Sequence, residues 1–506
     1  MSNAENNKRI AKNTILLYVR MLLTMSISLY TSRMILKILG VEDFGIYNIV
    51  GGIVVLFSFL NSAMASATQR FLSFELGRGD DDEIKRVFSM SMTAHISIAF
   101  LVIILGETIG LWFLNSQLNI PAGRMIAANW VFQFTILTFC IQIIRVPYTA
   151  SIIAYERMSF YAYISIIEVI LKLISVFLLF YFAWDKLKLY AGLTSGVMLI
   201  ILILYKLYCT RVFKTCYYNY FWDASLYRKL LSYTGWSLFG GIASVGAQQG
   251  LYIFLNIFWG VSVNAAMGIA NQVSSAVYSF TSSFQTAFNP QIIKSYSSND
   301  PTYFMSLIFQ TSKFSYYLML LLALPILICT DFILKIWLEI VPEYSSSFCR
   351  LIILYLLLDA IFAPLWMSVQ ATGNIRNYQI LIGTLVFLNL PLSYIFLKFG
   401  FPPESGLFIR VLINLLSYFA SILYLRHQIG LPARRYVQEV ILPVSTVTIL
   451  VLPIPLIVNQ YFSNWVGFIV TTIVALLSTL LSVYTVGIKK NERRLLNQMI
   501  IKKIRR

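Results

Sequence analysis

The sequence predicts an all-α polytopic membrane protein. Of its 506 residues, 58% are hydrophobic and only 12% are charged, whereas charged residues make up about a quarter of a typical soluble domain. The mean hydropathy is +0.75. The apolar residues gather in blocks of roughly 20, the length with which a helix crosses the hydrocarbon core of a bilayer. The pattern is that of a membrane protein and not of a soluble domain.

We expect about fourteen membrane-spanning helices. They share long apolar cores, and they are predicted at 13–38, 45–72, 87–113, 124–152, 159–183, 188–209, 231–258, 263–288, 304–330, 348–372, 378–399, 405–426, 437–459 and 464–487. The chain is then organised as an N-terminal lobe of six spans, a cytoplasmic connector, a C-terminal lobe of six spans, a final pair of spans and a basic tail. The bounds of these parts are 1–209, 210–230, 231–427, 428–488 and 489–506.

The two predicted lobes carry matching turns. A hairpin turn of about ten residues begins at Leu39 and reads Gly-Val-Glu-Asp-Phe-Gly-Ile-Tyr-Asn from Gly40 onward. A decayed copy begins at Trp259, roughly 220 residues later. Pro147 and Pro364 are separated by about 217 residues, and a short turn follows each. Because each lobe has an even number of spans, the repeat is parallel, with its axis along the membrane normal. This predicts two lobes that face each other across a central cavity; chance similarity between apolar segments is the alternative.

The basic residues predict the orientation in the membrane. The net charge is +18, and most Lys and Arg residues lie between apolar blocks on one side, which the positive-inside rule assigns to the cytoplasm. Both termini are therefore expected to be cytoplasmic. Nucleic-acid binding is not favoured, because no nucleic-acid module is visible. The tail at 489–506 suits either an amphipathic helix on the membrane surface or a disordered basic tail.

Nothing in the sequence predicts catalysis or a bound metal. The chain has five scattered cysteines and two histidines, so we expect no metal site, no disulfide framework and no cofactor. Its polar start leads into a full-length span, so no cleavable signal peptide is predicted. A membrane-embedded glycosyltransferase or ligase would need catalytic carboxylates and sizeable loops, whereas the longest outer loops, near 115–124 and 331–348, are short. The protein is expected to have no catalytic residues and not to be an enzyme.

Ionisable residues deep in the predicted spans are the candidate site residues. Each costs several kcal/mol against lipid unless it faces a cavity or a partner. The cations predicted to bind substrate are Arg20, Arg145, Lys172 and Lys313. The acids predicted to carry a coupling ion are Glu168 and Asp359. Glu168 and Lys172 are four residues apart on one helix, so a self-neutralising pair is the alternative for these two.

Three other polar residues in the spans have a different expected role. Arg33 and Arg410 lie near the outer ends of their spans and are expected to snorkel to the membrane surface. His95 lies in the middle of the third span, where a hydrogen-bonded packing residue is expected more than a proton carrier. Among the candidate site residues, cations outnumber acids. A cavity lined in this way would attract an anion such as a phosphate or diphosphate.

The first eighty or so residues resemble a known family of transporters. The resemblance rests on Lys8-Arg9-Ile10-Ala11-Lys12-Asn13-Thr14, on Ser28-Leu29-Tyr30-Thr31-Ser32-Arg33, on the turn sequence from Gly40 onward and on Ala67-Thr68-Gln69-Arg70-Phe71. These segments are similar to Wzx-type polysaccharide flippases of the multidrug/oligosaccharidyl-lipid/polysaccharide (MOP) exporter superfamily. The span count and the two-lobe layout extend the likeness along the whole chain.

The resemblance implies a transport function. It implies two six-helix lobes around a V-shaped cavity, two extra helices and alternating access. The implied cargo is an oligosaccharide on undecaprenyl diphosphate, moved from the cytoplasmic to the periplasmic leaflet of the bacterial inner membrane for a surface glycan such as O-antigen lipopolysaccharide or capsule. Cationic cavity residues would hold the diphosphate, and a proton or sodium gradient would drive transport. Arg20 matches the arginine that this family tends to place in the first span. Other polysaccharide assembly proteins would be its protein partners.

Two other kinds of transporter remain open. A MATE-type drug antiporter of the same superfamily typically has an acid in the first span, whereas this chain has Arg20 and Arg33 there and no acid. A lipid II flippase also has fourteen spans and a cationic cavity. The arginine-plus-aspartate pairing of that family is not visible in the first span of this chain.

Overall fold

The described residues fold into helices joined by turns and loops. The computed structural model describes residues 3–55, 58–116, 120–182, 184–259, 261–298, 300–338, 341–461, 464–489 and 492–493, and these residues contain helices and turns but no strand. The tail helix predicted at 489–506 lies almost wholly outside these residues. The side chain of Arg33 also lies outside them.

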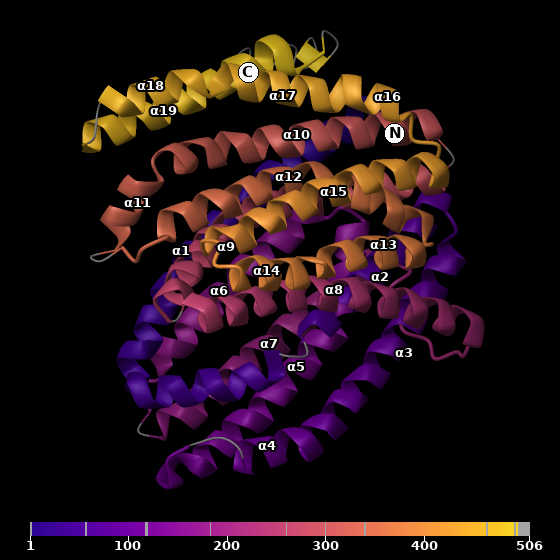
Figure 1. The fold of residues 1–506 in the computed structure, drawn as a ribbon. Helices are drawn as coiled ribbons and strands as arrows, with labels where there is room; N and C mark the ends of the chain where they lie inside the picture. Colours follow the sequence, from indigo (N-terminus) through magenta and orange to yellow (C-terminus); the bar gives the residue numbers. More distant parts are fainter. Residues whose placement is uncertain are drawn as a thin grey trace, which may run out of the picture. The chain divides into compact units, whose positions relative to one another are not determined.

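The helices follow the predicted spans closely (Figure 1). In chain order they are α1 (Asn3–Val55), α2 (Ser58–Arg78), α3 (Asp81–Leu105), the π-helical turn η1 (Gly106–Gly110), α4 (Leu111–Ser116), the 3-10 turn η2 (Ala122–Arg124), α5 (Met125–Ala154), α6 (Met158–Leu178), α7 (Lys186–Val212), α8 (Ala224–Trp259), α9 (Val261–Ser297), α10 (Pro301–Ile328), α11 (Thr330–Trp337), α12 (Ser345–Thr372), α13 (Arg376–Phe387), α14 (Asn389–Lys398), α15 (Glu404–Gln428), α16 (Ala433–Tyr436), η3 (Val437–Ile441), α17 (Leu442–Val451), α18 (Pro453–Tyr461), α19 (Trp465–Ser482) and η4 (Val483–Gly487).

Eleven helical stretches in the described part of the chain are long and apolar enough to cross a membrane. They coincide with eleven of the predicted spans. The other three predicted spans, at 13–38, 45–72 and 263–288, fall in α1, α2 and α9, which are helical as well. The predicted all-α membrane fold is therefore confirmed.

The first hairpin turn is tighter than predicted. The sequence suggests a turn of about ten residues from Leu39, but α1 leaves helical geometry only at Gly40, with φ 77° and ψ 171°, and the helix then resumes. Glycine adopts this positive φ without the steric cost that a Cβ would bring. In the second half of the chain α8 ends at Trp259 and α9 begins at Val261. Gly260, the matching position of the repeat, lies outside the described residues.

The chain divides into two compact units. Unit 1 comprises Met1–Gly241 with two short segments from the second half of the chain, Thr286–Asp300 and Gln370–Ile375. Unit 2 comprises the remaining residues from Ile242 to Arg506. The units do not follow the predicted lobe boundary at 210–230, and the lobe bounds stay a prediction.

Unit 1 is built around α5. This helix packs against α2, α3 and α7, while α1 packs against α6. The apolar core between these helices includes Phe88, Phe132 and Ile143, which are fully buried. Beside it, α3, η1 and α4 run on as one long bent helix (Figure 1). Because α5 contacts most helices of the unit, a charged residue on it can reach several of them.

Unit 2 has a second set of packed helices. There α13 and α14 pack against α15, and α10 packs against α19. The helices α18 and α19 lie side by side (Figure 1). The hydroxyl groups of Tyr316 on α10 and Thr448 on α17 form a hydrogen bond of 2.8 Å.

Local structure repeats at the predicted offset. The hydroxyl of Ser151 donates to the carbonyl oxygen of Pro147 in α5 at 2.8 Å, and the hydroxyl of Ser368 donates to that of Pro364 in α12 at 2.7 Å. The matching bonds, 217 residues apart, favour a true internal repeat over chance similarity.

Candidate functional site

The candidate site starts from α6, whose two faces differ. Tyr161, Ser165, Glu168 and Lys172 recur at intervals of three and four residues, so they share one face of the helix. The opposite face is apolar and exposed, as a lipid-facing surface would be, and consists of Tyr163, Ile167, Ile170 and Ile174. The polar face of α6 meets α1, α5 and α7.

Glu168 holds two of the predicted cations. Its Oε2 lies 3.0 Å from Nη1 of Arg145 on α5, and its Oε1 lies 2.8 Å from Nζ of Lys172 on α6. The three side chains are 18%, 22% and 33% exposed, respectively. The alternative of a Glu168–Lys172 pair within one helix is therefore correct in part, because Arg145 shares the carboxylate.

Arg20 joins the same region through two tyrosines. Its guanidinium carbon lies 4.8 Å from the ring centroid of Tyr161, which is a cation–π contact. Arg145 makes a similar contact, at 5.6 Å, with the ring of Tyr205 on α7. The two tyrosines lie in one apolar cluster and Tyr205 interacts electrostatically with Tyr161, Arg145 and Glu168. The geometry thus connects α1, α5, α6 and α7 through their charged and aromatic side chains.

We call this group of side chains the cation cluster; its members are Arg20, Arg145, Lys172, Glu168, Tyr161 and Tyr205. The cluster has three cations and one carboxylate, and only Arg145 and Lys172 pair with that carboxylate. No acidic side chain lies within ion-pair distance of Arg20 among the residues that the structure describes, and its buried Nε has no hydrogen-bond partner there. The cluster therefore carries an excess of positive charge, and guanidinium groups suit phosphate oxygens because of their planar set of donors.

Lys313, the fourth predicted substrate-binding cation, has a different environment. It lies on α10 in unit 2 and is only 2% exposed. Its Nζ contacts both carboxylate oxygens of Glu492, at 2.8 and 3.1 Å. One buried cation faces one acid here, so this pair has no surplus charge to offer an anion.

Asp359, the second predicted ion-coupling acid, also lies in unit 2. It is half-buried on α12 and interacts electrostatically with Arg410 on α15. The guanidinium of Arg410 stacks over Tyr355, with its carbon 4.3 Å from the ring centroid. The sequence led us to expect Arg410 to snorkel outward. Its contact with Tyr355 places it beside α12. The position of Arg410 within its own span does not reveal this neighbour.

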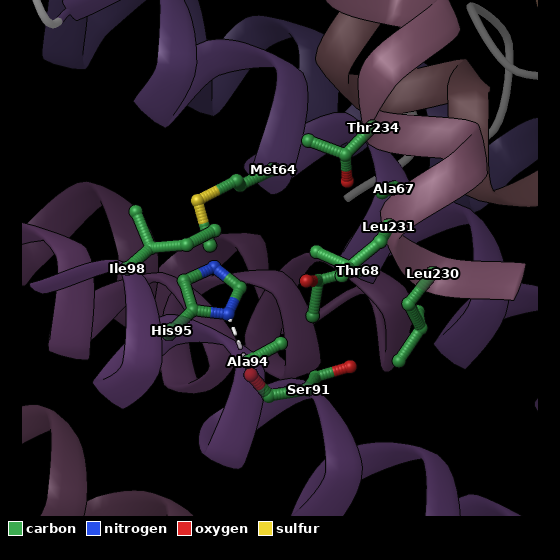
Figure 2. Close-up of a pocket in the computed structure, with 10 residues that line it drawn as sticks. All are labelled: Met64, Ala67, Thr68, Ser91, Ala94, His95, Ile98, Leu230, Leu231 and Thr234. Carbon is green, nitrogen blue, oxygen red and sulfur yellow. Dashed lines mark hydrogen bonds between the residues drawn. The ribbon is translucent and has the colours of Figure 1, made fainter. Parts of the chain in front are cut away.

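A small cavity surrounds His95 (Figure 2). It is lined by residues of α2, α3 and α8 and has a free volume of about 10 Å³, close to the smallest space that holds one water molecule. His95 is fully buried, and its Nδ1 lies 2.7 Å from the carbonyl oxygen of Ser91. Since a carbonyl can only accept, Nδ1 carries the proton. Nε2 points toward Met64 and is an acceptor without a hydrogen-bond partner among the described residues. The hydrogen bond agrees with the packing role expected for His95.

The turn that carries the sequence resemblance has a structural role. Asp43 in this turn accepts a hydrogen bond of 2.8 Å from Nε of Arg124, and Nη1 of Arg124 reaches Asp185 at the same distance. The two acids raise the pKa of Arg124, mainly through the hydrogen bond that its guanidinium donates to Asp43. This clamp ties α1 to the starts of α5 and α7.

The sequence missed the two tyrosines of the cation cluster. Tyr161 could have been found, because it lies on the same face of α6 as Glu168 and Lys172. Tyr205 could not, since only the packing of α7 against α5 and α6 brings its ring to Arg145. Among the described residues no group of His, Cys, Asp and Glu side chains could hold a metal ion.

Part of the chain matches a transporter family. Residues 228–395, from the first turn of α8 into α14, match the MatE family model. The chain is also similar to the uncharacterized membrane protein EpsK of Bacillus subtilis (strain 168), with 23% identity over 159 residues. That match spans 31% of this chain and 31% of EpsK. The chain therefore matches only about a third of the length of this curated relative.

Solved structures share most of the architecture. The MATE transporter ClbM in complex with Rb⁺ superposes with a TM-score of 0.73 at 15% identity, over 87% of this chain and 97% of ClbM. A MOP superfamily transporter from Pyrococcus furiosus gives 0.71 at 12% identity, over 83% and 96% of the two chains. A MATE structure in the straight conformation gives 0.73 at 13%, over 84% and 96%. The chain has the fold of MATE transporters.

Proposed function

We propose that this chain is a lipid-linked oligosaccharide flippase. It would lie in the bacterial inner membrane with both termini in the cytoplasm, and would move glycan units on undecaprenyl diphosphate from the cytoplasmic to the periplasmic leaflet by alternating access. The observation that carries the proposal is the cation cluster, because its surplus of positive charge is suited to a diphosphate. The glycan would serve surface polysaccharide synthesis, together with other assembly proteins.

The cluster offers a diphosphate two kinds of contact. Arg20 has no acidic partner among the described residues, so its guanidinium can receive phosphate oxygens directly. Arg145 and Lys172 are held by Glu168 at 3.0 and 2.8 Å and would turn from the carboxylate to the phosphate. Charge-assisted hydrogen bonds of this kind are about twice as strong as neutral ones.

Glu168 would couple cargo to an ion. When the diphosphate takes Arg145 and Lys172, the carboxylate loses both of its cations, and a half-buried carboxylate without cations is more stable when a proton or Na⁺ neutralises it. Cargo binding and ion binding then favour each other, as thermodynamic linkage requires. Asp359, beside Arg410 in unit 2, is the second candidate for this role.

A MATE-type drug antiporter is the second candidate function. The MatE match at 228–395 and the likeness to ClbM favour it. Such a protein would carry a cationic cargo, which a surplus of cations in unit 1 would repel. The fold itself permits a pocket of another polarity: the Pyrococcus furiosus transporter is described as having a binding pocket of reverse polarity that suggests a different function. A lipid II flippase would share the diphosphate and differ in its sugars.

Transport by the purified protein in proteoliposomes tests the proposal. The two cargoes are a fluorescent undecaprenyl-diphosphate oligosaccharide and a cationic dye, offered in parallel. We expect the lipid-linked sugar to move and the dye not to move. Dye transport alone would overturn the proposal in favour of the antiporter. Transport of lipid II at a higher rate than the oligosaccharide would assign the cargo to the other flippase class.

A further inference from the structure

Two turns related by the internal repeat share an unusual backbone. Glu156, between α5 and α6, has φ 58°, and Gly373, between α12 and α13, has φ 77°. They are 217 residues apart, as are Pro147 and Pro364. A positive φ costs glycine little but is uncommon for glutamate. The surroundings of Glu156 must therefore hold it in place.

Three donors surround the Glu156 side chain, which is 0% exposed. Its Oε2 lies 2.7 Å from Nε of Arg9 at the start of α1. Near the end of α9, Nζ of Lys294 lies 2.8 Å from Oε1 and Nε2 of Gln291 donates to Oε2 at 2.6 Å. All four residues belong to unit 1. The carboxylate thus joins a turn of the first half of the chain to a helix of the second half.

Arg70 makes the corresponding contact near the end of α2. Its Nε and Nη2 each donate at 3.0 Å, to the carbonyl oxygens of Gln370 and Ala371 respectively. These carbonyls lie in the last turn of α12, where no further helical N–H can reach them. Arg70 is only 6% exposed and stacks on Phe71 and Phe74, at 4.7 and 4.6 Å. A cation at a helix C-terminus also suits the helix dipole.

The two contacts are reciprocal. Arg70 and Gln291 are 221 residues apart, near the ends of the second long helix of each half. Each of these helices therefore holds the turn after the kinked, proline-containing helix of the other half. The helices also touch one another: a Cβ at Gly77 of α2 would lie 1.7 Å from Oγ of Ser297 and 2.8 Å from the carbonyl oxygen of Lys294 on α9.

These contacts lie on the side predicted to be cytoplasmic. They involve the start of α1 and the ends of α2, α5, α9 and α12, which all face the same side if each helix crosses the membrane once. The positive-inside rule places that side in the cytoplasm, because of the cations Arg9, Arg78, Arg157, Lys294 and Arg376.

We propose that these contacts form a latch that keeps the cytoplasmic side of the transporter closed and releases when that side opens. The cytoplasmic latch comprises Glu156 with Arg9, Gln291 and Lys294, and Arg70 with the carbonyl groups of Gln370 and Ala371. Alternating access requires the two halves of a parallel repeat to separate on the side that opens. Both contacts join residues of different halves, so both must break. The proposal holds for any cargo and does not depend on the flippase function.

The chemistry of the latch allows it to open. Burial lowers the pKa of Lys294, and the neighbouring Glu156 offsets only part of this effect. The cost of removing these charges from water therefore cancels much of their attraction. Opening returns them to water. Arg70 binds neutral carbonyl groups, so its release leaves no buried acid without a cation. The latch contacts are therefore specific, but their net stabilisation is small enough for the two halves to separate.

A side chain between α2 and α9 tests the latch without removing any of its charges. In the Gly77→Ala protein the new Cβ would lie 2.8 Å from the carbonyl oxygen and 2.9 Å from the Cα of Lys294, so α2 and α9 must move apart. Gly235→Ala on α8 is the control, because a Cβ there meets no described atom within 4 Å. We expect Gly77→Ala, and not Gly235→Ala, to open the latch, measured as an at least about tenfold faster reaction of the Ser295→Cys thiol with a membrane-impermeant maleimide in inside-out vesicles. Labelling of the Gly77→Ala protein at the parent rate would overturn the proposal.

Labelling tests release of the latch without any cargo. Ser295→Cys introduces a thiol at a buried position of α9, and a membrane-impermeant maleimide is added to inside-out vesicles. Adding Arg70→Gln should raise the labelling rate by about tenfold or more, because the two charge-assisted hydrogen bonds to the end of α12 are lost. Arg86→Gln is the matched control, since Arg86 pairs with Glu83 and Asp223 at exposed positions. Equal labelling in the Arg70→Gln and Arg86→Gln proteins would contradict the latch.

The two tests fail separately. If neither the sugar nor the dye moves, the flippase proposal fails while the labelling result still stands. If Arg70→Gln prevents folding, the Gly77→Ala protein retains every charge of the latch and remains informative.

Discussion

The deep cations of the two units are balanced in different ways. In unit 1, Arg145 and Lys172 share Glu168, and Arg20 has no acidic neighbour among the described residues. In unit 2, Lys313 is the one cation paired with Glu492 among the described residues, and the backbone N–H of Lys489 also donates to that carboxylate. Both sets looked alike in the sequence, as cations inside apolar spans. A charged side chain deep in a span must have a partner, and its depth can be read from the sequence. Whether that partner is a ligand or a neighbouring acid depends on how many acids surround the charge.

The largest expected effect on stability comes from breaking the balanced pair. Glu492→Gln leaves the buried ammonium group of Lys313 without its acid, and breaking such a pair typically costs about 3–5 kcal/mol. We expect a clear fall in the unfolding temperature of the detergent-solubilised protein. Transport per folded molecule should stay unchanged, because this pair is not part of the cation cluster. Lys313→Met with Glu492→Gln should recover much of the loss.

For Arg20→Gln we expect a large effect on ligand binding and a small effect on stability. Removing a cation that has no acidic partner should change stability little, but should weaken the binding of a prenyl diphosphate by about 10- to 100-fold, since hydrogen bonds to charged groups are worth roughly 1.5–3 kcal/mol. Lys37→Gln removes an exposed cation from the same helix and is the control. If both variants bind alike at equal abundance, Arg20 is not part of an anion site.

Glu168→Gln tests the role of the carboxylate in the cation cluster of unit 1. The amide no longer holds Arg145 and Lys172 by charge, so the diphosphate should bind a few-fold more tightly. Binding should also lose its dependence on pH or Na⁺, because the group that takes up the ion has gone. Titration of the prenyl diphosphate at several pH values measures both effects. A pH dependence equal to that of the parent would assign coupling elsewhere, with Asp359 as the next candidate.

The smallest effect is expected at Asp223, which precedes α8. The backbone N–H groups of Leu226 and Ser225 donate to its carboxylate, and mainly the first of these bonds lowers its pKa. A carboxylate with a lowered pKa in the folded state stabilises the fold above its ordinary pKa, and this contribution is lost as the pH falls through the lowered value. Asp223→Asn should therefore remove a small part of the acid sensitivity of unfolding while changing little at neutral pH, where asparagine is also a good N-cap. A steeper acid dependence in the variant would show that the sign is wrong.

The helices could be predicted well because each is a property of one continuous stretch. The apolar blocks of the sequence and the helices agree closely, and the turn at Gly40 differs only in length. The charged residues of α5 and α6 could be found by depth for the same reason. The repeat could be recognised from Pro147 and Pro364, whose local hydrogen bonds match in the structure.

Partners across helices could not be predicted. Lys313 and Glu492 are 179 residues apart, and the sequence placed Glu492 in a basic tail without a binding role. Glu156 looked like part of an ordinary turn, because nothing in a single sequence shows that a turn residue becomes buried against another helix. Arg70 lay within the resemblance motif, but its contact with the end of α12 depends on packing between the two halves of the chain.

Equilibrium binding of two ligands of opposite charge tests most directly whether the cation cluster is an anion site. The purified full-length protein in nanodiscs is titrated with a short-chain prenyl diphosphate and, separately, with a lipophilic cation of similar size. We expect the diphosphate to bind and Arg20→Gln to weaken this binding by at least about tenfold. We expect the lipophilic cation not to compete with the diphosphate. Binding of the cation in preference to the diphosphate, unaffected by Arg20→Gln, would contradict the anion site and favour a drug antiporter.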